Sequence, residues 1–470
     1  MAAERRALDG WAVAAVALGV RLLVVWWAWG RFPPTADGSY YHQLATRLAG
    51  GHGYTWLWPD GAVTFAAHYP IGYPAAVAGI YGAFGPAPGL AMVLNAVVGA
   101  IGCVAVHQLV AHFRHRRLAL AAGLLVALHP GLVGYTPALM TEGVAASVVA
   151  CAVWAATVVR STPVGRRRWL WLTLCGVLLG VATLVRPQCL VLAPVLGVVA
   201  WGSRRGLGRA LVAGALVTAL ALAVCAPWTA RNCQRMGRCA LVSVNGGWNL
   251  LIGTDPAGRG GWAPLKTPAE CREVFDEAGK DECFEGAAWR AIVAAPGAWL
   301  ALVPQKLSVT FDYCGAAGWY LHEANPQAFD ARAKAVLGIV ETAWERLVLV
   351  LATLSLWPRR MGKRGGRAAA GWALRALVLL GVGFALSRHG WVAYLALLAA
   401  LCLRRPGLLR APPILGGVLA TLICVTAVHA VFFGAGRYQL LLLPVLCALA
   451  ALGLGRLRTL GRDAARLVQR

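Results

Sequence analysis

The sequence contains little charge, and acidic residues are especially scarce. Only 13% of the 470 residues are charged and 19 are Asp or Glu, whereas 59% are hydrophobic. Soluble domains usually carry about twice this share of charged residues. The composition therefore excludes an ordinary soluble enzyme and indicates a membrane protein.

Several familiar motifs are also missing. No segments of alternating polarity are present, which excludes a transmembrane barrel. No Cys/His spacing typical of zinc occurs, and no Gly-rich loop lies between a strand and a helix, where a nucleotide sugar would bind. The first apolar run ends in "WWAWGRFPP", without a small-residue cleavage site, so we expect a retained helix rather than a signal peptide.

Long apolar runs dominate what is present. Most are about the length needed to cross roughly 30 Å of hydrocarbon as a helix. We predict an all-α polytopic membrane protein, a bundle of about twelve transmembrane helices with two extracytoplasmic loop regions. The predicted spans are 11–30, 89–111, 118–134, 139–159, 169–185, 188–202, 209–227, 336–357, 371–387, 389–403, 413–433 and 437–455.

The formal charge of +25 is concentrated in short breaks between these runs. If the N-terminus is cytoplasmic, every basic cluster falls on the cytoplasmic side, as the positive-inside rule requires. The charge therefore predicts a topology with both ends cytoplasmic and contact with anionic membrane lipids, rather than nucleic-acid binding. The clusters are 112–117, 160–169, 202–209, 359–367, 404–410 and the tail from Arg456.

Five segments follow from this topology: a first transmembrane helix (1–30), a first extracytoplasmic loop (31–88), transmembrane helices (89–227), an extracytoplasmic loop domain (228–335), and C-terminal transmembrane helices with a cytoplasmic tail (336–470). The loop domain holds five of the 13 cysteines. An oxidising exterior allows bridges such as Cys233–Cys239 and Cys271–Cys283. Sequence alone does not fix the connectivity, and free cysteines are the alternative.

The first loop contains an acid next to an apolar run. Asp37 precedes "SYYHQLATRLAGGHGY", in which apolar residues recur at helical spacing until Gly50 and Gly51. We predict a short amphipathic helix along the membrane surface, with Ser39 as its N-cap. The following segment, residues 68–85, is rich in Pro and Gly and is predicted to contain little helix.

Other charged residues fall at the same predicted membrane face. Glu142 begins the fourth span, and four arginines lie at outer helix ends: Arg186, Arg231, Arg388 and Arg437. An acid there can act as a general base, and arginines can hold a phosphate through forked hydrogen bonds. Simpler roles are the alternative: Asp37 as a helix cap, Glu142 as the partner of an interfacial arginine, and the arginines as snorkelling anchors.

Seven motifs, in order, resemble the GT-C superfamily of membrane glycosyltransferases. They are Asp37 with "YYHQLATRLAGGHGY", then "HYPIGYP", "PALMTEG", "LVRPQCLVLAP", "APWTARNCQRMG", "VSVNGGWNLLIGTDP" and "GRYQLLLLP". Within the superfamily the chain is similar to the branch of protein O-mannosyltransferases and lipid A aminoarabinose transferases, related to glycosyltransferase family 39. The motifs extend from residue 37 to residue 444, nearly the whole chain.

The resemblance implies a polyprenyl-phosphate sugar donor and an extracytoplasmic acceptor. It assigns Asp37 and Glu142 to catalysis, with a divalent metal near them as a further option, and Arg186, Arg437 and Tyr438 to the donor phosphate. The remaining expected substrate contacts are Tyr41, His68, Tyr73, Arg231, Asn249 and Arg388. Many relatives have an acidic pair in the first loop, but here Gly38 follows Asp37, which removes one potential metal ligand.

The expected reaction is an inverting displacement at the anomeric carbon, in which Asp37 removes the proton from the attacking group of the acceptor. In a bacterium the enzyme would lie in the inner membrane with its site facing the periplasm. The alternatives are a transporter or flippase of lipid-linked anions, a polysaccharide polymerase or ligase, and a binding scaffold. The sequence lacks the paired halves with broken midplane helices that are typical of transporters.

Overall fold

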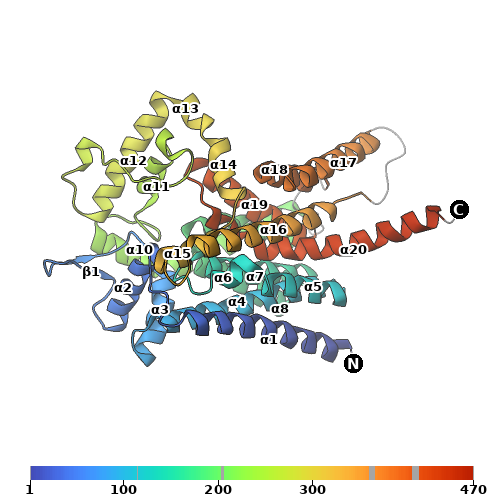
Figure 1. Ribbon diagram of the computed structural model, residues 1–470, viewed down its shortest axis with the longest axis horizontal. Coiled ribbons are helices and arrows are strands. Elements are labelled where there is room, and N and C mark those ends of the chain that lie inside the picture. Colours follow the sequence, from blue (N-terminus) through green and yellow to red (C-terminus); the bar gives the residue numbers. More distant parts are fainter. Residues whose placement is uncertain (1, 114, 203–205, 359–365, 405–411, 469–470) are drawn as a thin grey trace.

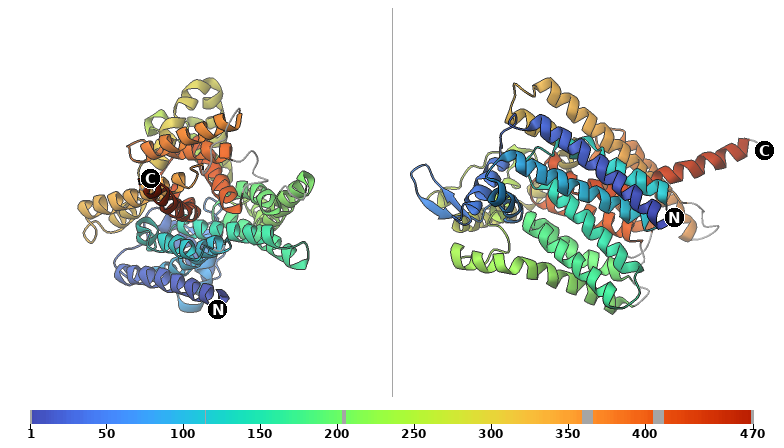
Figure 2. Two further views of the ribbon diagram at one scale, coloured as in Figure 1. Left: turned by 90° about the vertical axis from the view of Figure 1, so that its right-hand side faces the viewer. Right: turned by 90° about the horizontal axis from the view of Figure 1, so that it is seen from below.

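A computed structural model describes residues 2–113, 115–202, 206–358, 366–404 and 412–468. Most helices run roughly along one axis, and the two ends of the bundle differ (Figure 1). One end carries α2, the β1–β2 hairpin and α11 to α13, and we call it the loop end. The first turns of α1 and the last turns of α20 lie at the opposite, terminal end, as Figure 2 also shows. Both termini on one side agree with an even number of crossings.

Seven helices in the described ranges are long and apolar enough to cross a membrane. They are α1 (Ala2–Ala28), α4 (Pro88–Ala111), α7 (Glu142–Ser161), α8 (Arg166–Val185), α10 (Leu207–Met236), α17 (Gly366–Ala385) and α19 (Pro413–Val431).

The other five predicted spans are also helical, although they are shorter, broken or more polar. They are α5 (Arg116–Ala127) with α6 (Pro130–Gly134), η1 (Pro187–Val191) with α9 (Leu192–Trp201), α16 (Ala331–Leu354), α18 (Gly390–Arg404), and η5 (Gly436–Leu441) with α20 (Leu443–Val468). The predicted all-α polytopic membrane fold is thus confirmed.

Two predicted spans need correction. The prediction of one helix over 118–134 is wrong, because α5 ends at Ala127 and Pro130 starts the separate short helix α6. Proline disfavours helical backbone in the residue before it, which accounts for the break at His129. The span expected to stop at residue 227 instead continues through Pro227 to Met236.

The first loop contains α2 (Asp37–Ala49), the antiparallel strands β1 (Thr55–Leu57) and β2 (Val63–Phe65), and α3 (Gly72–Phe84). The predicted short helix ending before Gly50 is present, but Ser39 is not its cap. The helix begins at Asp37, and the Ser39 hydroxyl donates to the Ala36 carbonyl. The prediction of little helix over 68–85 is wrong, because Pro74 falls in the first turn of α3, where its missing N–H costs no hydrogen bond.

The second polar segment, beyond α10, forms mostly short elements at the loop end. They are α11 (Gly246–Ile252), η3 (Pro256–Gly258), η4 (Ala269–Cys271), α12 (Glu277–Ala294), α13 (Pro296–Ala301), α14 (Val303–Phe311) and α15 (Ala316–Ala324). The predicted bridges Cys233–Cys239 and Cys271–Cys283 are both present, and Cys314 is free and buried.

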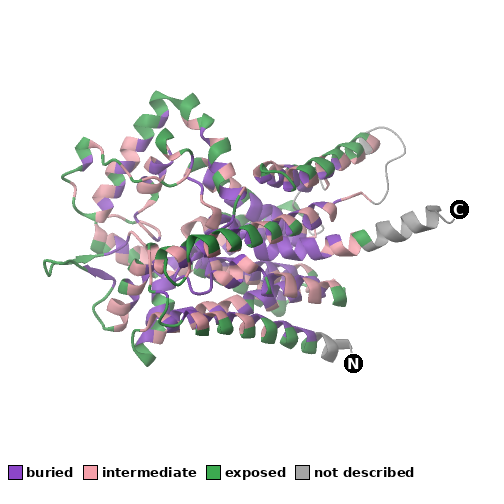
Figure 3. Cartoon of the chain, in the orientation of Figure 1, coloured by how far each residue is buried: buried purple, intermediate pink, exposed green. Residues whose placement is uncertain are grey.

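The apolar core runs along the middle of the bundle, where most residues of α7 and of the first turns of α20 are buried (Figure 3). The elements of the loop end are more exposed (Figure 3). This arrangement fixes the helix ends at the loop end against a rigid core, and the candidate site is built from those ends.

Candidate active site

Four charged residues that are far apart in the sequence meet at the loop end. Asp37 is the first residue of α2, and Glu142 is the first residue of α7. Arg186 follows the last residue of α8, and Arg437 is the second residue of η5. Each position is a helix end next to a Pro, Gly or Thr. Backbone breaks therefore place these side chains at one level of the bundle.

Arg437 joins the two acids. Its Nη1 lies 3.0 Å from Asp37 Oδ2, and its Nε lies 3.3 Å from Glu142 Oε1. Arg186 Nη1 lies 2.7 Å from the same Glu142 oxygen and donates to Thr141 Oγ1 at 3.0 Å. Two carboxylates and two guanidinium groups thus form one network with a formal charge of zero.

The two acids differ in accessibility. The Glu142 side chain is 2% exposed, and it also accepts a hydrogen bond from the Tyr135 hydroxyl at 3.2 Å. The Asp37 side chain is 32% exposed. A substrate can therefore approach Asp37, whereas Glu142 has protein partners on every side and is suited to holding the arginines in place.

Tyr438 supports the two arginines through its ring. The guanidinium carbons of Arg186 and Arg437 lie 5.1 Å and 5.3 Å from the ring centroid, within cation–π range. The Tyr438 ring in turn stacks on the ring of His429, with centroids 4.1 Å apart. Tyr438 therefore holds the guanidinium groups of Arg437 and Arg186 next to each other.

Aromatic residues of the first loop form one wall around Asp37. The Tyr69 hydroxyl donates to Asp37 Oδ1 at 3.4 Å. Burial, together with the nearby Asp37 carboxylate, raises the pKa of Tyr69, so its phenol stays protonated and remains a donor. Tyr41 packs edge-on against Tyr69 and Tyr73, and Tyr73 is fully buried below it. Tyr41 is thus close to the charged network, whereas Tyr73 lies beneath it.

His68 connects this wall to the second polar segment. Its ring contacts Tyr69 and Trp248, and its backbone N–H donates to Glu277 Oε2 at 2.9 Å. Burial lowers the pKa of His68, although the carboxylates of Glu277, Asp281 and Asp37 oppose the shift. A neutral imidazole at this point can accept or donate a hydrogen bond.

Of the other predicted substrate contacts, Arg231 serves the framework. Arg231 donates to the carbonyls of Ala66 and Tyr54 at 2.8 Å and stacks on Trp228. Its guanidinium thereby fixes the loop that carries His68. Asn249 is half-buried in α11, and Arg388 is exposed in the turn between α17 and α18.

Sequence reasoning did not select three tyrosines that organise the site: Tyr69, Tyr135 and Tyr320. Tyr69 directly follows His68 in "HYPIGYP", and Tyr135 lies one helix break before Glu142, so the motifs contained a usable signal for both. Tyr320 had no such signal, because its hydroxyl reaches the site from α15. It accepts hydrogen bonds from the backbone N–H groups of Thr35 and Leu139, both at 3.3 Å.

Tyr320 also explains why glycine follows Asp37. A Cβ atom on Gly38 would lie 2.6 Å from the Tyr320 hydroxyl and 3.1 Å from the Leu139 carbonyl oxygen. The residue before the acid, Ala36, has a φ of 50°, a conformation that L-residues rarely adopt. Asp37 is thus held on a tight, strained turn that has no room for a second acidic side chain.

The network does not fit a divalent metal. The Arg437 guanidinium lies between the two carboxylates, and Arg186 adds a second positive charge beside Glu142. A metal ion would meet both cations at close range, with two carboxylates as the acidic ligands. No group of three or more His, Cys, Asp or Glu side chains in the described part of the chain is arranged to hold a metal.

Comparison with known proteins agrees with the sequence motifs. Residues 69–230 match the model of the dolichyl-phosphate-mannose-protein mannosyltransferase family. The predicted resemblance to this family of membrane glycosyltransferases is confirmed over that part of the chain, which is 162 of its 470 residues. A comparison with curated proteins found no match.

The solved structures that are similar to this chain include the following two. The chain is 15% identical to the oligosaccharyltransferase AglB of Archaeoglobus fulgidus, in complex with an inhibitory peptide and a dolichol-phosphate, with a TM-score of 0.48 and 96% of this chain covered. It spans only 50% of the AglB chain. It is also 15% identical to ArnT of Cupriavidus metallidurans bound to undecaprenyl phosphate, with a TM-score of 0.40, covering 98% of this chain and 81% of ArnT.

The crowding at Gly38 yields a stability prediction. Gly38→Ala is expected to lower the free energy of unfolding by about 1–3 kcal/mol, the usual cost of overpacking. Thermal unfolding of the detergent-purified protein measures this change. Gly79→Ala is the matched control, because a Cβ on this α3 glycine meets nothing within 4 Å. Equal stability of the two variants would show that Gly38 is not confined.

The charged network also predicts how activity responds to chelation. Because Arg437 lies where a metal would bridge the acids, we expect EDTA to leave the rate of sugar transfer unchanged, and added Mg²⁺ or Mn²⁺ not to raise it. The assay compares initial rates of the reconstituted protein before chelation, after chelation and after metal is restored. A loss of rate that metal restores would contradict the expectation.

Proposed function

We propose that this protein is a membrane glycosyltransferase that transfers a sugar from a polyprenyl-phosphate donor to an extracytoplasmic acceptor, with inversion at the anomeric carbon. The sugar is a hexose or a pentose, and the acceptor is a lipid, a glycan or a protein. In a bacterium the site would face the periplasm from the inner membrane. The observation that carries the proposal is the network that joins accessible Asp37 to Arg437 and Arg186.

The donor class rests on the arginines and on the family match. Two guanidinium groups beside a helix break at the membrane end are well suited to a phosphate on a lipid carrier. The matching family is named for a mannose donor on dolichyl phosphate, a lipid-linked phosphate sugar. A lipid carrier also accounts for the lack of a nucleotide-sugar motif in the sequence.

In the proposed reaction Asp37 is the general base. It removes the proton of the acceptor hydroxyl or amine as the new bond to the anomeric carbon forms and the bond from that carbon to the phosphate oxygen breaks. Polyprenyl phosphate leaves with the electron pair, and Arg186 and Arg437 stabilise its growing negative charge. The half-exposed Asp37 carboxylate suits this role better than the buried Glu142 carboxylate does.

Donor binding would also prepare the base. In the structure Arg437 is shared between Asp37 and Glu142. A donor phosphate would compete with Asp37 for this guanidinium, while Glu142, with its additional contacts to Arg186 and Tyr135, would keep hold of both arginines. The Asp37 carboxylate would then turn to the acceptor only once donor is present.

The remaining predicted contacts have proposed roles according to their position. Tyr41 and His68 border the acid and would face the sugar or the acceptor, with Tyr73 supporting Tyr41 from below. Asn249 and Arg388 would contribute to binding from the periphery. Arg231 would act indirectly by fixing the His68 loop.

The direct test is Asp37→Asn in proteoliposomes. The wild type is given a panel of undecaprenyl-phosphate hexoses and pentoses with peptide, glycan and lipid acceptors, and released undecaprenyl phosphate is measured. Asp37→Asn is expected to lower the release rate by about 10²–10⁴-fold, the usual contribution of a general base.

Asp60→Asn is the matched control, because this exposed acid of the same loop accepts a hydrogen bond from the Ala62 N–H at the hairpin tip. It should leave the release rate unchanged. Unchanged release by Asp37→Asn would remove Asp37 from the mechanism. Movement of the intact lipid across the bilayer, with no release from any donor, would identify a flippase instead.

A further inference from the structure

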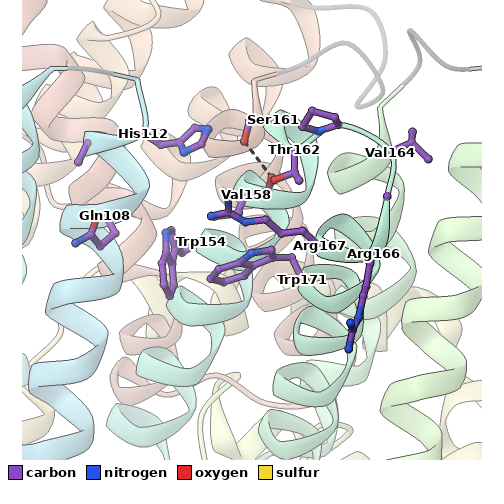
Figure 4. Close-up of a pocket in the computed structure, with 13 residues that line it drawn as sticks. Gln108, His112, Trp154, Val158, Ser161, Thr162, Val164, Arg166, Arg167 and Trp171 are labelled. Atoms are coloured by element: carbon purple, nitrogen blue, oxygen red, sulfur yellow. Dashed lines mark hydrogen bonds between the residues drawn. The ribbon is translucent and has the colours of Figure 1, made fainter. Parts of the chain in front are cut away.

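A pocket at the terminal end of the bundle is separate from the proposed active site. It lies among the last turn of α4, the last turns of α7 and the first turns of α8 (Figure 4), and its volume is about 650 Å³. Glu142 and Ser161 are the two ends of α7, so the pocket and the charged network are about 30 Å apart along one helix. The pocket is therefore at the opposite membrane face.

The polar side chains around this pocket favour an anion. Arg166, Arg167, His112 and Gln108 line it, and none of the described lining residues is acidic. Figure 4 shows the Arg167 side chain extending across the pocket toward Trp154, whereas Arg166 points away. The Arg167 guanidinium thus extends into the pocket, with a fork of donors suited to a phosphate.

The loop that carries Arg167 is preformed. The neighbouring Arg168 is fully buried, donates to the carbonyls of Thr162 and Trp201 at 3.2 Å and 3.3 Å, and stacks on the Trp201 ring. The Thr162 hydroxyl also donates to the Val158 carbonyl at 2.7 Å. These contacts hold the turn between α7 and α8 in place, so little ordering of the turn would accompany binding.

The pocket continues into an apolar surface. Trp154 and Trp171 form one wall, with ring centroids 5.2 Å apart. On α8 the residues Arg167, Leu170, Trp171 and Leu174 lie on one helical face. Leu170 and Leu174 are 59% and 38% exposed, as expected for side chains in contact with lipid. A ligand held by Arg167 could therefore extend an apolar tail along α8.

We propose that this pocket binds the phosphate of an anionic phospholipid, with its headgroup between Arg167 and His112 and an acyl chain along Leu170 and Leu174. The volume suits a glycerophosphate headgroup, since small-molecule pockets measure about 300–1,000 Å³. Basic pockets between transmembrane helices are a recurring way to bind anionic headgroups. Tryptophan beside the headgroup region is equally typical of the membrane interface.

The test uses the full-length protein in detergent with three probes: dioleoylphosphatidylglycerol, dioleoylphosphatidylcholine and inorganic phosphate. Native mass spectrometry measures bound lipid, and thermal unfolding measures stabilisation. Phosphatidylglycerol is expected to bind and stabilise the wild type, and phosphatidylcholine is not. Arg167→Ala is expected to weaken phosphatidylglycerol binding about tenfold, the effect of losing one charge-assisted hydrogen-bonding partner.

Arg209→Ala is the matched control, because it removes the same charge from an exposed residue in the first turn of α10, which does not line the pocket. It should bind like the wild type, and Arg167→Lys should be intermediate. Equal weakening by Arg209→Ala and Arg167→Ala, or no weakening by either, would overturn the proposal. Equal stabilisation by inorganic phosphate alone would overturn the lipid assignment and identify a site for a soluble phosphate.

Discussion

The sharing of one guanidinium between two carboxylates is the interaction on which the site depends. Arg437 comes from the last membrane region, Asp37 from the first loop and Glu142 from the start of α7. A buried carboxylate such as Glu142 is stable only when paired, and breaking such a pair costs several kcal/mol. The network therefore joins three distant parts of the chain. Each of the three residues lies at the start of a helix, where a break in the backbone brings its side chain to the network.

Much of the site could be predicted because helix ends and charges are local features. Asp37, Glu142, Arg186 and Arg437 each stand at a break that the sequence marks, and a consistent topology places those breaks at one face. Tyr320 could not be found this way, since its contacts with Thr35 and Leu139 depend on how α15 packs. The same limit applies to the twelve spans: all are helical, but a proline interrupts one span at Pro130 and is tolerated within another helix at Pro227, and that difference depends on tertiary packing.

The loop segment beyond α10 also holds the part of the chain that carries Arg437. Lys306 of α14 is buried, and its Nζ donates to the Ala430 and Val431 carbonyls, which end α19. Gly261 pairs with Gly434 through a parallel bridge. A side chain at Gly434 would collide with the Lys306 carbonyl. Three residues before Arg437, the backbone is thus fixed by contacts from outside the transmembrane bundle.

The contacts of Lys306 and Gly261 with the segment before Arg437 have a consequence for how substrate specificity can evolve. If the segment beyond α10 selects the acceptor, then the same segment also sets the position of Arg437, the guanidinium that we propose for the donor phosphate. Variation that reshapes acceptor choice near Gly261 or Lys306 would also shift Arg437. Specificity for the two substrates is therefore expected to evolve jointly, with compensating changes on both sides of the Gly261–Gly434 contact.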